Sequence, residues 1–218
     1  WRQMKYDLRD QIDELVKVGE DYAVFQNAQG TAKSLKQIKR ILDKINNIDA
    51  TFTTTCPSVL NFLPNNNKNF FIPNPSDLSF ETLNNFSKPC NVDVFFALSH
   101  GVHRGVLKTG KTDDRINFIE KLKDMTSDVK FDIYGVDQVQ PIWADHYFKT
   151  ISNAKMGLNL SRGDAIKYYS SDRITQIIGN GLVCLIDEKT QYQDFFNDKE
   201  MVFYKNISDL SEKISKIS

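Results

Sequence analysis

Residues 92–218 show apolar blocks whose spacing switches regularly between a strand-like and a helix-like period. Five short apolar runs have the length of buried strands: Val92–Leu98, Lys130–Gly135, Met156–Leu160, Leu182–Ile186 and Met201–Tyr204. Between them, apolar residues recur at the three- and four-residue spacing of a helix face: Asp113–Met125, Pro141–Ala154, the segment from Ser170 to Gly179, a short stretch at Tyr192–Phe196 and the segment from Ser208 onward. This alternation predicts an α/β fold with a parallel, doubly wound, Rossmann-like sheet that binds ligands at the carboxyl ends of its strands.

The first seventy residues also alternate, but they contain too few elements for a complete domain of the same kind. Apolar residues recur at helical spacing in residues 8–16 and 35–45. Residues 50–55 and 68–72 have the composition of strands. The two prolines at Pro73 and Pro75 forbid both a helix and a central strand. The sequence therefore predicts a partial α/β segment at 1–75 and a larger domain at 76–218.

The stretch from Lys155 to Glu188 predicts a strand, a polar loop, a helix and a second strand. Ser170-Ser171-Asp172 is a helix-start pattern, and Gly179-Asn180-Gly181 ends that helix. A polar loop that leads into a helix N-terminus gathers backbone N–H groups and the positive end of the helix dipole, an arrangement that suits a phosphate. Arg173 lies in the first turn, where a positive charge opposes the dipole, and this indicates an anion nearby.

The amino-acid composition argues against nucleic-acid binding, membrane insertion and metal binding. The chain has 28 basic and 28 acidic residues, so it has no net charge that would attract nucleic acid or a membrane surface. No apolar run approaches the length of a membrane span. The three cysteines are far apart and show no metal-ligand spacing with any histidine, which predicts buried thiols, a reducing cytoplasm and no metal site. Trp143 and the pair Phe195-Phe196 are expected to pack in the core.

The run SSDRITQIIGNGLVCLIDEKTQYQDFF, followed by MVFYKNISDLSEKI, resembles the C-terminal lobe of a GT-B glycosyltransferase. Within that fold it is most similar to the "glycosyl transferases group 1" type that includes the spore-maturation glycosyltransferases, and the resemblance covers roughly residues 92–218. It implies a metal-independent glycosyltransferase that takes a nucleotide-diphosphate sugar as substrate and uses no cofactor. The acceptor would be a saccharide, a lipid-linked group or a protein. Residues 1–75 would then be the end of an acceptor-side lobe, and the chain a fragment of a longer enzyme.

The resemblance also implies site residues, whereas the catalytic group stays unknown. Donor-phosphate ligands would be Arg104, in the loop after the first strand of the regular half, together with Ser170, Ser171 and Arg173. Ribose or sugar ligands would be His100, Gln176, Asp187 and Glu188. Each of these residues also has a simpler interpretation: a solvated loop, a helix cap by Ser171, a surface ion pair of Arg173, or a solvated turn.

One departure from the family pattern leaves the donor and the stereochemistry open. Many retaining GT-B enzymes carry two glutamates eight residues apart, the second of which lies five residues before a glycine. Counting back from Gly181 places Gln176 and Tyr168 at these positions. A non-catalytic Rossmann-like binding or assembly module is therefore a second hypothesis. The absence of a G-x-G-x-x-G pattern argues against dinucleotide binding.

Overall fold

The computed structural model describes residues 25–26, 32–33, 50–60, 63, 68–98, 114–136, 139–161 and 163–218. The helices predicted at 8–16 and 35–45, and the loop that contains His100 and Arg104, lie outside these described residues. The chain divides into two compact units. Unit 1 comprises Trp1–Pro73 together with Ile166–Tyr169, and unit 2 comprises Asn74–Ala165 together with Ser170–Ser218. The assignment of these units to an acceptor side and a donor side stays a prediction.

The described residues of unit 1 form two small strand pairs. β1 (Phe25–Gln26) pairs antiparallel with β2 (Ala32–Lys33), and β3 (Ala50–Thr53) pairs parallel with β4 (Lys68–Phe71). The 3₁₀ turn η1 (Pro57–Val59) follows β3. The later segment 166–169 is attached here, because the Cys56 N–H donates to the Lys167 carbonyl at 3.1 Å and the Tyr168 ring lies 5.2 Å from that of Phe71.

Unit 2 is built on a five-stranded sheet in which every described pairing is parallel. Its strands are β5 (Val92–Ala97), β6 (Phe131–Tyr134), β7 (Ala154–Asn159), β8 (Val183–Asp187) and β9 (Met201–Tyr204). Their order across the sheet is β6-β5-β7-β8-β9. The chain first runs outward from β5 to β6 and then returns to β7 on the other side of β5. The point where the direction of winding reverses therefore lies between β5 and β7, and ligands of doubly wound sheets bind at the carboxyl ends of such a strand pair.

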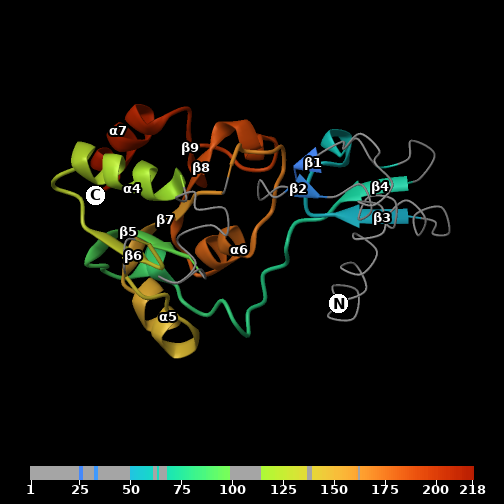
Figure 1. Cartoon of the computed structure of the whole chain (residues 1–218). Helices are drawn as coiled ribbons and strands as arrows, with labels where there is room; N and C mark the ends of the chain where they lie inside the picture. The colour runs from blue at the N-terminus through green and yellow to red at the C-terminus, as the bar shows by residue number, and fades with distance from the viewer. Residues whose placement is uncertain are drawn as a thin grey trace. The chain divides into compact units, whose positions relative to one another are not determined.

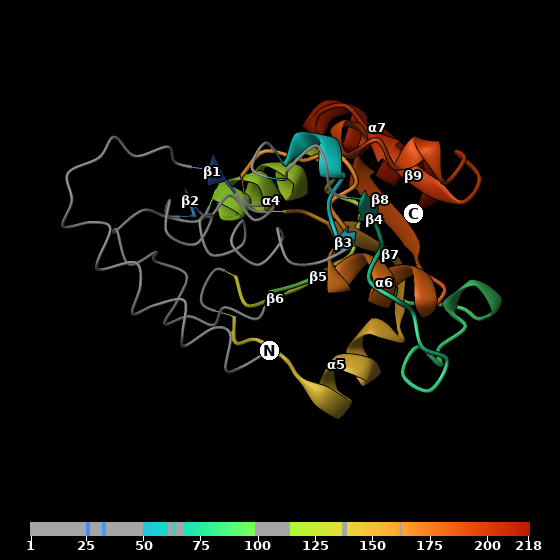
Figure 2. The same cartoon turned by 90° about the vertical axis from the view of Figure 1, so that its right-hand side faces the viewer.

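Helices cover both faces of this sheet, as Figures 1 and 2 show. On one face, α4 (Asp114–Met125) and α7 (Ile207–Ile217) bury Leu122 and Leu210 against one side of the strands. On the other face, α5 (Ala144–Ile151) and α6 (Asp172–Gly179) bury Ile151 and Ile177. The described part of unit 2 also contains the 3₁₀ turns η2 (Asn85–Ser87), η4 (Glu188–Thr190) and η5 (Tyr192–Asp194). The predicted doubly wound α/β fold is confirmed.

The helix predicted at Pro141–Ala154 is wrong at both ends. It begins at Ala144, because Trp143 has an extended backbone at the N-cap position, and it ends at Ile151. Ala154 is already the first residue of β7 and pairs with Val92. The prediction that Trp143 packs in the core is also wrong, since this side chain is 61% exposed. Helical spacing alone did not show that Trp143 stands outside the helix that follows it.

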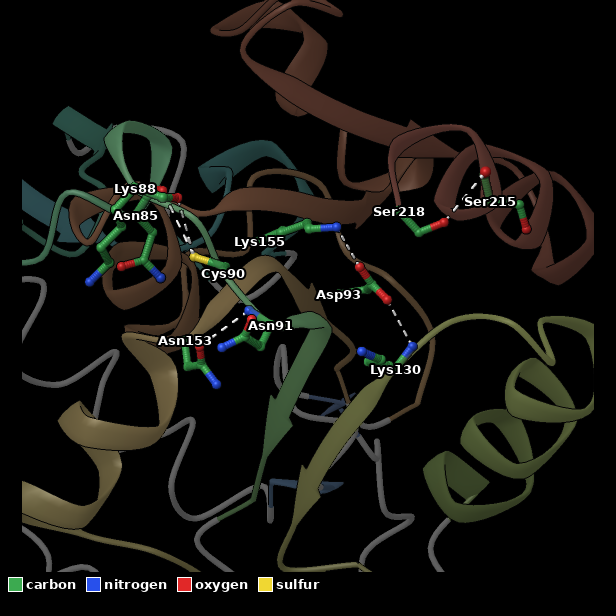
Figure 3. A network of polar contacts seen from close by, with 10 residues as sticks. All are labelled: Asn85, Lys88, Cys90, Asn91, Asp93, Lys130, Asn153, Lys155, Ser215 and Ser218. Atoms are coloured by element: carbon green, nitrogen blue, oxygen red, sulfur yellow. Dashed lines mark hydrogen bonds and ion pairs between the residues drawn. The ribbon is translucent and has the colours of Figure 1, made fainter.

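A polar network ties the amino ends of β5, β6 and β7 together (Figure 3). Asp93 of β5 accepts a hydrogen bond from the Lys155 ammonium at 2.8 Å and another from the Lys130 N–H at 2.9 Å. Nearby, the Asn91 N–H donates to the Asn153 side-chain oxygen at 3.2 Å. Burial by itself raises the pKa of Asp93, but the bonds from Lys155 and Lys130 outweigh it, so the pKa of this carboxyl is lowered. The network fixes the amino ends of these strands, at the edge of the sheet opposite to their carboxyl ends.

The lowered pKa of Asp93 predicts a pH dependence of stability. A carboxyl with a depressed folded-state pKa stabilises the fold above its unfolded pKa of about 4, and this contribution is lost as the pH falls through the folded-state pKa. We expect Asp93→Asn to be less stable than the parent at pH 7, with a difference that shrinks below about pH 4. Urea denaturation at several pH values would measure this. A difference that stayed constant down to pH 2 would contradict the role given to Asp93.

Candidate functional site

Arg173 lies at the reversal point of the sheet. One terminal nitrogen, Nη1, donates to the Leu160 carbonyl at 3.2 Å, and Nη2 lies 3.4 Å from the Ala97 carbonyl. Ala97 is the last residue of β5, and Leu160 follows the last residue of β7. The guanidinium carbon also stands 4.9 Å from the centre of the Phe96 ring, within the range of a cation–π contact. The cation in the first turn of α6 therefore sits among carbonyl oxygens at the carboxyl ends of both strands.

The start of α6 is not capped by its own N-cap side chain. Ser171 holds the N-cap position with an extended backbone, but its hydroxyl makes no bond to the first turn. It donates instead to the side-chain oxygen of Asn159 at 3.1 Å. Asn159 ends β7 and is only 4% exposed. The simpler interpretation of Ser171 as a cap through its side chain is thus wrong, although its backbone carbonyl accepts a hydrogen bond from the Ile174 N–H at 3.1 Å.

Ser170 is buried beneath the segment that enters unit 2. Its oxygen accepts a hydrogen bond from the Asn74 N–H at 2.9 Å, and the residue is 3% exposed. The side-chain amide of Asn74 donates to Asp172 at 2.7 Å, and Thr175 donates to the Asn74 carbonyl at 3.2 Å. Ser170 therefore has a structural partner in this structure, and its predicted role as a phosphate ligand stays a prediction.

Gln176 lies one turn further along α6, where it joins this helix to α5. Its side-chain oxygen accepts a hydrogen bond from the Tyr147 hydroxyl at 2.7 Å. Burial raises the pKa of Tyr147 to about 12, with Arg173 opposing and Glu81 reinforcing the shift. The Tyr147 hydroxyl is thus protonated at neutral pH and holds the Gln176 oxygen. The predicted contact of Gln176 with a ribose or sugar stays a prediction.

Asp187 is the last residue of β8 and Glu188 follows it, at the carboxyl edge of the sheet. The Asp187 carboxylate accepts from the Lys189 N–H at 2.8 Å, and the Asp187 carbonyl accepts from the Thr190 hydroxyl at 2.6 Å. Asp187 thereby caps the 3₁₀ turn η4, in which Glu188 is the first residue. One of the Asp187 carboxylate oxygens is thus engaged in the turn. Whether either acid binds a sugar hydroxyl stays a prediction.

The structure brings together Ser171, Arg173 and one residue that the sequence did not single out. Asn159 lies within an apolar run of the sequence, and the feature that could have identified it is an amide at the carboxyl end of a buried strand.

Burial raises the pKa of the Cys184 thiol to about 12, so this thiol is not a nucleophile at neutral pH. Within the described ranges, no group of three or more histidine, cysteine or acidic side chains could hold a metal ion.

Comparison with known proteins finds a similarity to one family. Residues 115–218 match the family described as glycosyl transferase-like. No curated protein matches the chain significantly. The matched residues include α4 from its second residue onward, all strands of the sheet except β5, and the helix that carries Arg173. This match and the parallel sheet fit the C-terminal lobe of a GT-B glycosyltransferase. None of the helices in the described part of the chain is both long and apolar enough to cross a membrane.

Proposed function

We propose that this glycosyltransferase-like chain binds a nucleotide-diphosphate sugar at the carboxyl edge of its sheet, and that the protein transfers the sugar to an acceptor. The observation that carries the proposal is the position of Arg173 between the ends of β5 and β7, beside the start of α6 that Ser171 leaves uncapped. A guanidinium offers several N–H donors in a plane, and a helix start adds backbone N–H groups and a positive dipole end. Both features suit a diphosphate.

In the proposed reaction, the bond between the sugar C1 atom and the diphosphate oxygen breaks, and a bond from C1 to an acceptor oxygen forms. The acceptor hydroxyl passes its proton to a general base, and the nucleoside diphosphate leaves with the bonding electron pair. Negative charge therefore grows on the leaving diphosphate as the bond breaks. Donors fixed at that position stabilise this charge without reorganisation, which is the main contribution we assign to Arg173 and the start of α6.

The remaining roles are those that the resemblance to GT-B glycosyltransferases implies. Arg104 and Ser170 would contribute further phosphate contacts, and His100, Gln176, Asp187 and Glu188 would contact the ribose or sugar. The proposed mechanism needs no metal ion, because protein cations and backbone N–H groups would balance the charge of the diphosphate. The acceptor is a saccharide, a lipid-linked group or a protein, and its choice would depend on surfaces other than this edge.

Calorimetric titration of the chain with nucleoside diphosphates of the five common bases tests the proposal. We expect at least one diphosphate to bind with a Kd in the micromolar range, on the order of −7 to −8 kcal/mol, and its free nucleoside to bind at least tenfold more weakly. A chain that bound no diphosphate, or bound nucleoside and diphosphate equally, would contradict the proposal and favour a non-catalytic module.

A further inference from the structure

Three asparagines among the described residues are buried, and Asn159 differs from the other two in what its side-chain N–H groups bind. Asn85 donates from Nδ2 to two backbone carbonyls, each at 2.8 Å, and Asn180 donates from Nδ2 to a third at 2.8 Å. Asn159 accepts a hydrogen bond from the Ser171 hydroxyl through Oδ1, but no described residue accepts one from its Nδ2. Its two N–H donors therefore remain for another acceptor.

These donors lie in surroundings that are otherwise apolar. Asn159 is the last residue of β7 and is 4% exposed, the preceding Leu158 is fully buried, and its partner in the sheet is the fully buried Ile186 of β8. Burying an amide costs free energy when its polar atoms lack partners, so an apolar side chain would suit this position better if packing were its only role. An oxygen atom of a bound molecule would supply the missing acceptor.

The amide stands at the carboxyl edge of the sheet, beside the residues already assigned to the diphosphate. Oδ1 and Nδ2 diverge from one carbon atom, so the bond of Oδ1 to Ser171 directs Nδ2 away from that hydroxyl. The carbonyl of the next residue, Leu160, accepts from Arg173 at 3.2 Å. We propose that Asn159 is a ligand of the donor: its Nδ2–H donates to an oxygen of the leaving diphosphate, while Ser171 fixes the plane of the amide. This inference rests on the proposed function and adds to it a neutral donor that is held in place before the ligand binds.

Titration of Asn159→Ala in a Ser171→Ala background, with the nucleoside diphosphate that the parent binds best, separates two roles of the amide. An amide that only orients the Ser171 hydroxyl has no further effect once that hydroxyl is gone. An amide that donates to the diphosphate still contributes, so we expect the double variant to bind diphosphate roughly tenfold more weakly than Ser171→Ala alone. The affinity for the free nucleoside should stay the same in both.

Two further variants control for charge and for burial. Asn159→Asp keeps an acceptor for the Ser171 hydroxyl but replaces the N–H groups by an oxygen that repels phosphate, so it should bind diphosphate more weakly than Asn159→Ala. Asn85→Ala is the matched control, because Asn85 is equally buried but bonds to the carbonyl of Ala154, at the amino end of β7. It should lose stability in urea denaturation and bind diphosphate like the parent under conditions where it is folded.

The outcomes separate this inference from the proposed function. A further loss of diphosphate affinity in the double variant, with nucleoside affinity unchanged, supports a direct contact of Asn159 with the diphosphate. No further loss, an equal loss for the nucleoside, or a loss of the same size in Asn85→Ala overturns the inference while the parent still binds diphosphate. A parent chain that binds no nucleoside diphosphate overturns the proposed function and the inference with it.

Discussion

Replacing Arg173 by alanine is expected to weaken the binding of a nucleoside diphosphate roughly tenfold to a hundredfold. A hydrogen bond to a charged group contributes about 1.5–3 kcal/mol, and each 1.4 kcal/mol corresponds to about a factor of ten in Kd. We expect a second effect on stability, because the same guanidinium bonds to the Leu160 carbonyl, approaches the Ala97 carbonyl and lies over the Phe96 ring. The free energy of unfolding should fall by about 1–2 kcal/mol. Calorimetric titration and urea denaturation measure the two effects separately.

Arg173→Lys and the free nucleoside are the controls for this prediction. Lysine keeps the charge but cannot reach two carbonyl oxygens with a planar fork, so its affinity should lie between those of the parent and the alanine variant. The nucleoside lacks phosphates and should bind the parent and both variants about equally. If Arg173→Ala lowered stability but left diphosphate affinity unchanged, Arg173 would be a purely structural link between the ends of β5 and β7.

Gly157→Ala is expected to give a large loss of stability, because α6 packs directly on this glycine of β7. An added Cβ atom would lie 2.7 Å from Cδ1 and 2.9 Å from Cγ2 of Ile177, and it would also meet Cγ1. Ile177 is 1% exposed and branched at Cβ, so its side chain has little room to turn away. Overpacking of this kind costs about 1–3 kcal/mol. Urea denaturation should show the loss, and diphosphate affinity should fall with it because α6 carries Arg173.

A double-mutant cycle with Ile177→Ala tests whether this clash is the cause. Ile177→Ala alone should destabilise the fold by about 2–5 kcal/mol, since it leaves a cavity beneath α6. In the double variant the new methyl group of residue 157 fills part of that cavity. The double variant should therefore be at least about 1 kcal/mol more stable than the sum of the two single effects predicts. Additive effects would show that Gly157 does not limit the approach of α6 to the sheet.

The sequence predicted the sheet of unit 2 because its strands are buried on both faces. Runs such as Met201–Tyr204 and Val92–Leu98 are almost continuously apolar, and that pattern is hard to mistake when helical segments separate the runs. The series of apolar runs along the chain did not determine the order of the strands across the sheet. Whether β7 lies beside β5 or beside β6 depends on which faces pack together, and this decides where the winding reverses. The predicted helix ends were the least accurate part, as α5 shows. Trp143 has the sequence spacing of a helix face, but in the structure it precedes the helix with an extended backbone.

The sequence by itself determined that α6 begins near Ser171 and carries a cation in its first turn, because helix starts depend on neighbouring residues. Only the tertiary structure decided what these side chains bind. Arg173 lies between the ends of β5 and β7, Ser171 is turned to Asn159, and Asp172 is bonded to Asn74, almost a hundred residues earlier. The physical reason is that a hydrogen bond depends on distance and direction in space, and only folding brings residues far apart in the chain within that range.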